Sequence, residues 1–147
     1  MSTDPTDLEV STMNDSKNSI QRAVTILVYR NPGSAHDYLT EVFGFTPGKV
    51  TLDADSNAVH AEVVVGDVTI WLHPENDKYE LASPQNIGAA AVTMAVFVDD
   101  VDEHYRLANE KGARIVSEPL DQPYGYREYS ARDCEGFLWS FMKEITP

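Results

Sequence analysis

Apolar and polar residues follow the same plan twice along this chain. A run of β-branched and aromatic residues within 22–30 predicts a buried strand. The segment after it, up to residue 44, predicts an amphipathic helix that begins after Asn31 and ends at a glycine. A second strand at 91–98 and a second capped helix after Asp100 repeat this plan, and the two cap residues are 69 positions apart. The chain therefore contains two copies of one module.

Three more strands are predicted in each copy, because short apolar runs alternate there with turn residues. They are residues 45–53, 58–65 and 68–73 in the first copy, and residues 114–117, 126–132 and 137–142 in the second. Gly66-Asp67 separates two of these strands and predicts a two-residue hairpin turn. The predicted fold class is α+β, with two tandem β-α-β-β-β modules that form a curved mixed sheet around a cleft.

The domain organisation follows from the same pattern and from a chain length of 147 residues. Residues 20–147 are expected to form one domain, in which module one covers 20–74, a polar linker covers 75–89, and module two covers 90–143. Residues 1–19 are rich in Ser, Thr, Asp and Asn, and we expect a disordered N-terminal tail.

Composition and charge narrow the choice of partners. The net charge of −13 argues against a nucleic-acid partner, because phosphate binding needs clustered Lys and Arg. No apolar run approaches the roughly 20 residues that span a membrane, so no membrane partner is expected. The chain begins without the basic and apolar segments of a secretory signal and has a single cysteine, Cys134, which together predict a cytoplasmic location.

Two stretches of the chain are similar to the vicinal oxygen chelate superfamily, which includes glyoxalases, bleomycin-resistance proteins and extradiol dioxygenases. They are residues 27–32 (Leu-Val-Tyr-Arg-Asn-Pro) and residues 123–133 with the turn that follows, and the resemblance extends over about 21–143. Cys134 and Phe137 depart from the Pro and the His that are frequent in that turn. The resemblance implies paired β-α-β-β-β modules and a homodimer, in which modules of two chains can complete each cleft.

Enzymes of this superfamily generally hold a divalent metal with His, Gln or Glu from the first and fourth strands of each module. In this chain those positions carry Val24, Trp71, Thr93 and Ser140. These residues offer at most two hydroxyl groups, whereas a catalytic metal site needs about three strong ligands. The sequence therefore predicts no metal, no cofactor and no catalytic residue at these positions.

A displaced site is a second interpretation of module one. Counting outward from the Gly66-Asp67 turn places His60, Glu62, Trp71 and His73 on one face of a hairpin, with Trp71 at the floor of the cleft. Three roles stay open for the histidines: partly exposed polar residues at the cleft mouth, ligand contact or pH sensing, and a metal site shared with Glu62.

Other residues are expected near the cleft in module two or in its loops. The predicted ligand contacts are Thr93, Phe97, Tyr124, Tyr126, Arg127 and Ser140. Trp139 alternates with two phenylalanines and is expected in the core instead. His36 lies off the apolar stripe of its helix and is expected to be solvated, and the pattern predicts no particular place for His104.

These observations favour a metal-free small-molecule binding protein of the bleomycin-resistance type, which sequesters an aromatic or cationic compound over Trp71. One alternative is a metal-dependent glyoxalase-like or dioxygenase-like enzyme that uses His60, Glu62 and His73. Another is a metal-free lyase or isomerase in which Glu62 is the general base.

Overall fold

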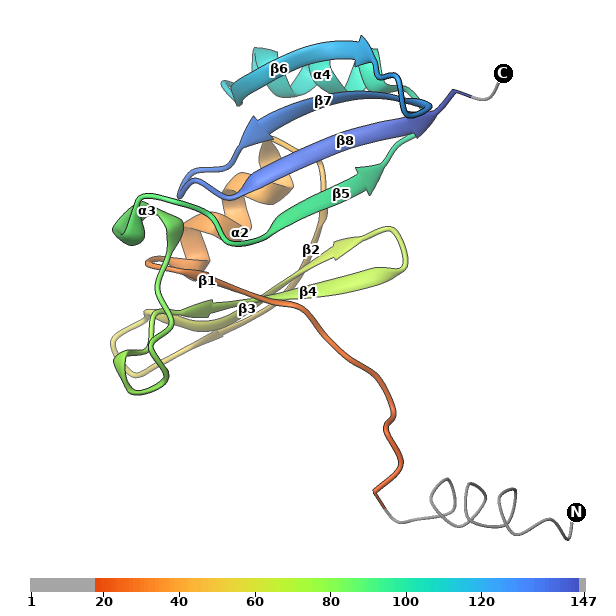
Figure 1. Ribbon diagram of the computed structural model, residues 1–147. Coiled ribbons are helices and arrows are strands. Elements are labelled where there is room, and N and C mark those ends of the chain that lie inside the picture. Colours follow the sequence, from red (N-terminus) through yellow and green to blue (C-terminus); the bar gives the residue numbers. More distant parts are fainter. Residues whose placement is uncertain (1–17, 146–147) are drawn as a thin grey trace, which may run out of the picture.

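The computed structural model describes residues 18–145, which contain two modules of the same element order (Figure 1). Module one consists of β1 (Ile26–Tyr29), α2 (Pro32–Glu41), β2 (Thr46–Leu52), β3 (Ala58–Val65) and β4 (Val68–Pro74). Module two consists of β5 (Thr93–Phe97), α4 (Val101–Glu110), β6 (Arg114–Asp121), β7 (Tyr126–Arg132) and β8 (Leu138–Glu144). The predicted tail lies almost wholly outside the described residues, since only 18 and 19 belong to both.

Each module forms a four-stranded mixed sheet. The strand order is β1-β4-β3-β2 in sheet one and β5-β8-β7-β6 in sheet two. The first strand of each module pairs in parallel with the last, and the other pairs are antiparallel. The predicted α+β fold of two tandem β-α-β-β-β modules is confirmed. The polar segment between the modules contains two short helices, η1 (Asp77–Tyr79) and α3 (Pro84–Ile87).

The two long helices begin where the sequence predicts. The side chain of Asn31 accepts a hydrogen bond from the Ser34 amide, and Asp100 accepts one from the Glu103 amide. These bonds satisfy amide groups that have no partner in the first turn of a helix. Gly44 after α2 has a φ of 79°, a backbone conformation that glycine adopts without strain.

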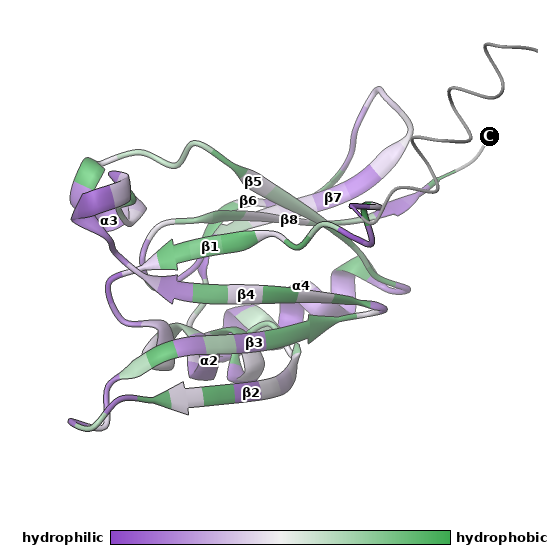
Figure 2. Ribbon diagram, turned by 90° about the horizontal axis from the view of Figure 1, so that it is seen from below, coloured by the Kyte–Doolittle hydropathy of each residue, from purple (hydrophilic) through white to green (hydrophobic). Residues whose placement is uncertain are grey.

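One apolar core joins the two sheets. Phe43 and Phe45, which follow α2, lie with their ring centroids 5.0 to 6.3 Å from those of Phe141 and Trp139 on β8. Trp139 is fully buried, as predicted. The helix-facing sides of both sheets are therefore turned toward one another, with α2 between them, as Figure 1 and the view from below in Figure 2 show. The other face of each sheet, called the outer face below, points away from this core.

A buried carboxylate on the β7–β8 turn joins the modules. Asp133 is fully buried, and it accepts hydrogen bonds from the Tyr29 hydroxyl at 2.6 Å and from Trp139 Nε1 at 2.9 Å. Its other oxygen accepts hydrogen bonds from the backbone amides of Glu135, Gly136 and Phe137. Burial, together with the neighbouring Asp133 carboxylate, raises the pKa of Tyr29 well above its ordinary value. Tyr29 thus stays a hydrogen-bond donor.

The Glu135 side chain makes a second bond between modules, at the start of α2. One of its oxygens accepts the Arg30 amide and the Ser83 hydroxyl, each at 2.6 Å, and the other accepts the Asn31 amide at 2.9 Å. A carboxylate at a helix N-terminus is also stabilised by the helix dipole. Module two therefore fixes the entry into the first helix of module one.

The two histidines on the long helices, His36 on α2 and His104 on α4, are both packed against neighbouring residues. His104 Nε2 donates to the Phe43 carbonyl at 2.8 Å, and its Nδ1 lies 2.6 Å from the Tyr129 hydroxyl. Burial lowers the pKa of His104, which outweighs the opposing effect of the Phe43 carbonyl. The expectation that His36 is solvated is wrong, because the residue is 9% exposed. The buried face of α2 includes Pro32 and His36 in addition to the predicted apolar stripe.

We expect Glu135→Gln to destabilise the protein by about 1–3 kcal/mol, because an amide nitrogen would then face a buried donor in place of an acceptor oxygen. Urea unfolding of the variant measures this change. Glu41→Gln is the matched control, since it removes the same charge from an exposed position on α2. Equal stability of the two variants would contradict a role for Glu135 in joining the modules.

Candidate functional site

The predicted hairpin register of module one is confirmed. Val65 pairs with Val68 across the Gly66-Asp67 turn, and Glu62 pairs with Trp71. Because side chains alternate along a strand, the outer face of sheet one carries one set of residues, called the module-one cluster. Its members are His60, Glu62, Trp71 and His73, all half-buried.

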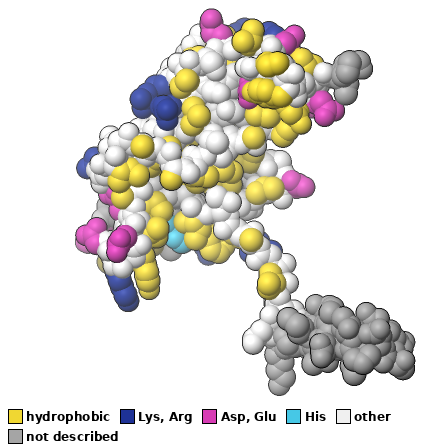
Figure 3. All heavy atoms as spheres, viewed as in Figure 1, with side chains coloured by type: hydrophobic (Ala, Val, Ile, Leu, Met, Phe, Trp, Pro, Cys, Tyr) yellow, Lys and Arg dark blue, Asp and Glu magenta, His cyan; other side chains and the backbone are white. Residues whose placement is uncertain are grey.

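The polar members of the module-one cluster form a hydrogen-bonded chain. His60 Nε2 lies 2.6 Å from Glu62 Oε2, and His60 Nδ1 lies 2.8 Å from His73 Nε2. The Trp71 ring meets the His60 ring edge-on at a centroid distance of 5.0 Å, and it lies nearly parallel to the His73 ring at 6.0 Å. Figure 3 shows histidine surface on the side of sheet one that faces away from sheet two. The cluster thus offers an aromatic face beside a polar chain.

Proton positions in this chain follow from the partners. The Glu62 carboxylate can only accept, so His60 carries a proton on Nε2 when it is neutral and accepts at Nδ1. His73 then donates from Nε2, which leaves the lone pair of its Nδ1 without a partner in the cluster. Burial, and to a smaller extent the neighbouring His60, lower the pKa of His73. His73 is therefore a neutral imidazole at neutral pH.

The donor atoms do not fit the metal that the family implies. The four expected positions carry a valine, a tryptophan, a threonine and a serine, as the sequence showed. Within residues 18–145, no three His, Cys, Asp or Glu side chains are arranged to hold a metal ion. Both ring nitrogens of His60 point at side-chain partners instead of at one shared point. The geometry of the donors disfavours the displaced metal site.

Aromatic side chains also lie together on module two. The ring centroid of Tyr126 is 5.7 Å from that of Phe97 and 6.1 Å from that of Tyr124. Phe97 and Tyr124 are 62% and 61% exposed. Ser140 and Thr93 lie on the same outer face, but Ser140 shares a hydrogen bond with Ser130, and Thr93 donates to a backbone carbonyl. Phe97, Tyr124 and Tyr126 thus form an aromatic row on module two, and Thr93 is also exposed.

Arg127 lies apart from the other predicted contacts. It follows Tyr126 on β7, so its side chain points to the opposite face of sheet two. Its guanidinium makes ion pairs with Asp102 at 2.8 Å and with Asp121 at 2.9 Å. These hydrogen bonds and charges raise the pKa of Arg127 and lower that of Asp102. Arg127 thus links β7 to the start of α4.

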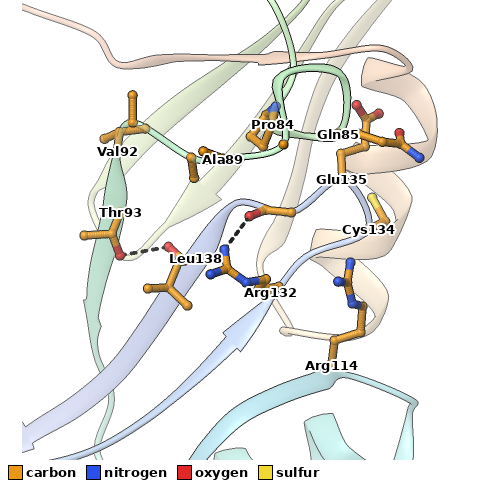
Figure 4. A pocket seen from close by; sticks show the side chains of 14 residues that line it. Pro84, Gln85, Ala89, Val92, Thr93, Arg114, Arg132, Cys134, Glu135 and Leu138 are labelled. Carbon is orange, nitrogen blue, oxygen red and sulfur yellow. Dashed lines mark hydrogen bonds between the residues drawn. The ribbon is translucent and has the colours of Figure 1, made fainter.

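The structure also reveals a hollow that the sequence analysis missed. It has a volume of about 780 Å³ and lies between α3, the segment leading into β5, and one end of sheet two. Arg114, Arg132 and Cys134 line it (Figure 4). Burial, with the neighbouring carboxylates Asp133 and Glu135, raises the pKa of Cys134 to about 12, so this thiol is a poor nucleophile. Only the register of β6 on β7 brings the two arginines together.

The helices among the described residues include none with the length and apolar character that crossing a bilayer requires.

The chain resembles proteins of known and unknown structure over most of its length. The structure of TioX from Micromonospora sp. ML1 matches with a TM-score of 0.68 and 31% identity, covering 86% of this chain and 100% of that one. A glyoxalase/bleomycin resistance protein/dioxygenase from Nocardioides matches with a TM-score of 0.64 and 18% identity, covering 95% and 93%. An uncharacterized protein of Mycobacterium tuberculosis is 29% identical over 127 residues, which cover 81% of this chain and 72% of that protein.

The sequence model of one family matches residues 20–141, which extend from before β1 into β8. Both β-α-β-β-β modules thus lie almost wholly within the match, in agreement with the fold of the Nocardioides protein. The chain belongs to the Glyoxalase/Bleomycin resistance protein/Dioxygenase superfamily.

Proposed function

We propose that this protein binds a small aromatic or cationic molecule without a metal, in the manner of a bleomycin-resistance protein. The observation that carries the proposal is Trp71, which occupies an expected metal position on the outer face of sheet one. A half-buried indole ring can stack on a planar ligand and attract a cation to its face. The imidazoles beside it add hydrogen-bonding groups that can orient the ligand.

We further propose a homodimer, because one chain presents its two ligand-binding surfaces on different sheets that face away from a shared core. Sheet one of one chain and sheet two of a second chain would together enclose a cleft. Large apolar side chains on the outer faces support this proposal: Ile26 is 44% exposed, Phe97 is 62% exposed and Leu120 is 60% exposed. Burying such side chains favours association.

Isothermal titration with proflavine, a planar aromatic cation, and with bleomycin tests the binding proposal. We expect Trp71→Ala to weaken the affinity for the compound that binds roughly tenfold, because the stacking surface is lost. Trp71→Phe keeps an aromatic face and should lose less, and Trp139→Phe, a change in the buried core, is the control for altered packing. Equal affinity of wild type and Trp71→Ala, or no binding of either compound, would remove the proposed site.

The dimer is tested by light scattering during size-exclusion chromatography, where wild type should have twice the mass of one chain. Phe97→Asp should shift the protein toward the monomer, because a charge would replace an apolar contact. Leu107→Asp is the matched control, since Leu107 is 42% exposed but lies on α4 rather than on an outer face. A monomeric wild type, or an equal effect of both variants, would argue against pairing through these faces.

A second candidate function is supported by the hydrogen-bonded chain from Glu62 through His60 to His73. Glu62 fixes the proton of His60, and His60 in turn orients His73, so that His73 Nδ1 can act as a general base. This arrangement suits a metal-free lyase or isomerase that removes a proton next to a carbonyl group. It assigns the role of base to His73 and makes Glu62 a positioning residue.

The chain of hydrogen bonds predicts ring-nitrogen NMR signals for two Nε2-protonated histidines, and a pKa of His73 below the ordinary value of 6.5. His60→Ala should raise the pKa of His73, because it exposes the ring and removes the neighbouring imidazole. The pKa of His104 should stay unchanged and serves as the internal control. The second candidate function would be contradicted by a wild-type His60 protonated on Nδ1, or by a His73 pKa that does not change in His60→Ala.

A further inference from the structure

The hollow at the end of sheet two contains an unusual pair of like charges. Arg114 on β6 and Arg132 on β7 are directly opposite in the strand register. Like charges directly opposite on neighbouring strands destabilise a sheet unless something of opposite charge lies between them. Figure 4 shows Arg114 extending from β6 toward Cys134, and Arg132 extending from β7 beside Leu138.

Neither arginine has an acidic partner in the part of the chain that the structure describes. The arginine ion pairs there involve Arg106 and Arg127. Arg132 donates from one nitrogen to the Gly136 carbonyl at 2.9 Å, which leaves the rest of its planar guanidinium for other acceptors. What sets these two arginines apart is that they lie opposite one another on neighbouring strands, which concentrates positive charge in a protein of net charge −13.

The acidic residue that lines the hollow makes no ion pair with either arginine. This residue is Glu135, which is 6% exposed, and its carboxylate accepts hydrogen bonds from module one and from Ser83. The Cys134 thiol stays protonated, as shown above. On the opposite wall, the segment 88–92 consists of one glycine, three alanines and one valine, and carries no charge. Figure 3 shows a patch of Lys or Arg side-chain surface at this end of sheet two.

We propose that Arg114 and Arg132 form an oxyanion-binding site, which takes the carboxylate or phosphate group of a small molecule. A guanidinium group presents parallel N–H donors that match the two oxygens of such a group. At about 780 Å³, the hollow has room for an organic body attached to the anion. This site belongs to sheet two and is separate from the module-one cluster, so it stands whether or not the proposed function is correct.

Isothermal titration with inorganic phosphate and with benzoate, in a low-salt buffer free of other oxyanions, tests the site and distinguishes the two kinds of anion. We expect one of these probes to bind at one site per chain, with an affinity that falls as sodium chloride is added. Arg114→Gln should weaken that affinity about tenfold, because a charge-assisted hydrogen bond is lost. Arg132→Lys keeps the positive charge but loses the parallel N–H donors of the guanidinium, so it should lose less affinity than Arg132→Gln.

Arg106→Gln is the matched control, because it removes the same charge from the exposed face of α4 and should leave the affinity unchanged. Thermal unfolding with and without the anion gives a second readout, since the anion should raise the melting temperature of wild type and Arg106→Gln more than that of Arg114→Gln. Failure of the folded wild type to bind either probe, or an equal loss in Arg106→Gln and Arg114→Gln, would overturn the proposal.

Discussion

Two buried carboxylates determine how the modules of this protein sit together. Asp133 and Glu135 lie on one turn of module two, and neither is paired with a cation inside the core. They are satisfied by hydrogen bonds instead, from the hydroxyl of Tyr29 and from the amides at the start of α2. A buried carboxylate without these donors would be too costly to keep, so the turn and the first helix can pack together only in this orientation. The helix-facing sides of both sheets are thereby closed into one core.

This orientation decides where functional side chains can lie. With both helix faces turned inward, the outer face of each sheet is left to ligands or to another chain. The module-one cluster therefore lies on the outer face of sheet one, and the aromatic row that includes Phe97 lies on the outer face of sheet two. The turn that holds Asp133 also carries Cys134, which lines the arginine hollow. A structural contact between modules thus shapes the wall of a separate candidate site.

Strict alternation along strands explains what the sequence predicted well. Once Gly66-Asp67 is taken as a two-residue turn, every pair of the β3–β4 hairpin follows, which is why the module-one cluster was found by counting. The same counting places Tyr126 and Arg127 on opposite faces of β7, but the resemblance to a family whose loop before this strand borders the cleft led us to expect both beside the ligand. The partner that holds Arg127, Asp102, is 25 positions away and belongs to a helix. The bond from His104 to the Phe43 carbonyl spans 61 positions between modules, and no local pattern encodes such contacts.

The net charge of the chain is also a poor guide to its ligands, because it does not say where the charges lie in the fold. An acidic chain favours cations on average, but binding depends on the charges that the fold brings to one place. Here carboxylates near the hollow are turned inward and bonded to amides, while Arg114 and Arg132 make no ion pair with any acidic residue in 18–145. The protein can therefore offer an aromatic surface at Trp71 and a basic hollow in module two, despite its overall charge. The arginine hollow is therefore a candidate site in its own right, whether or not two chains pair.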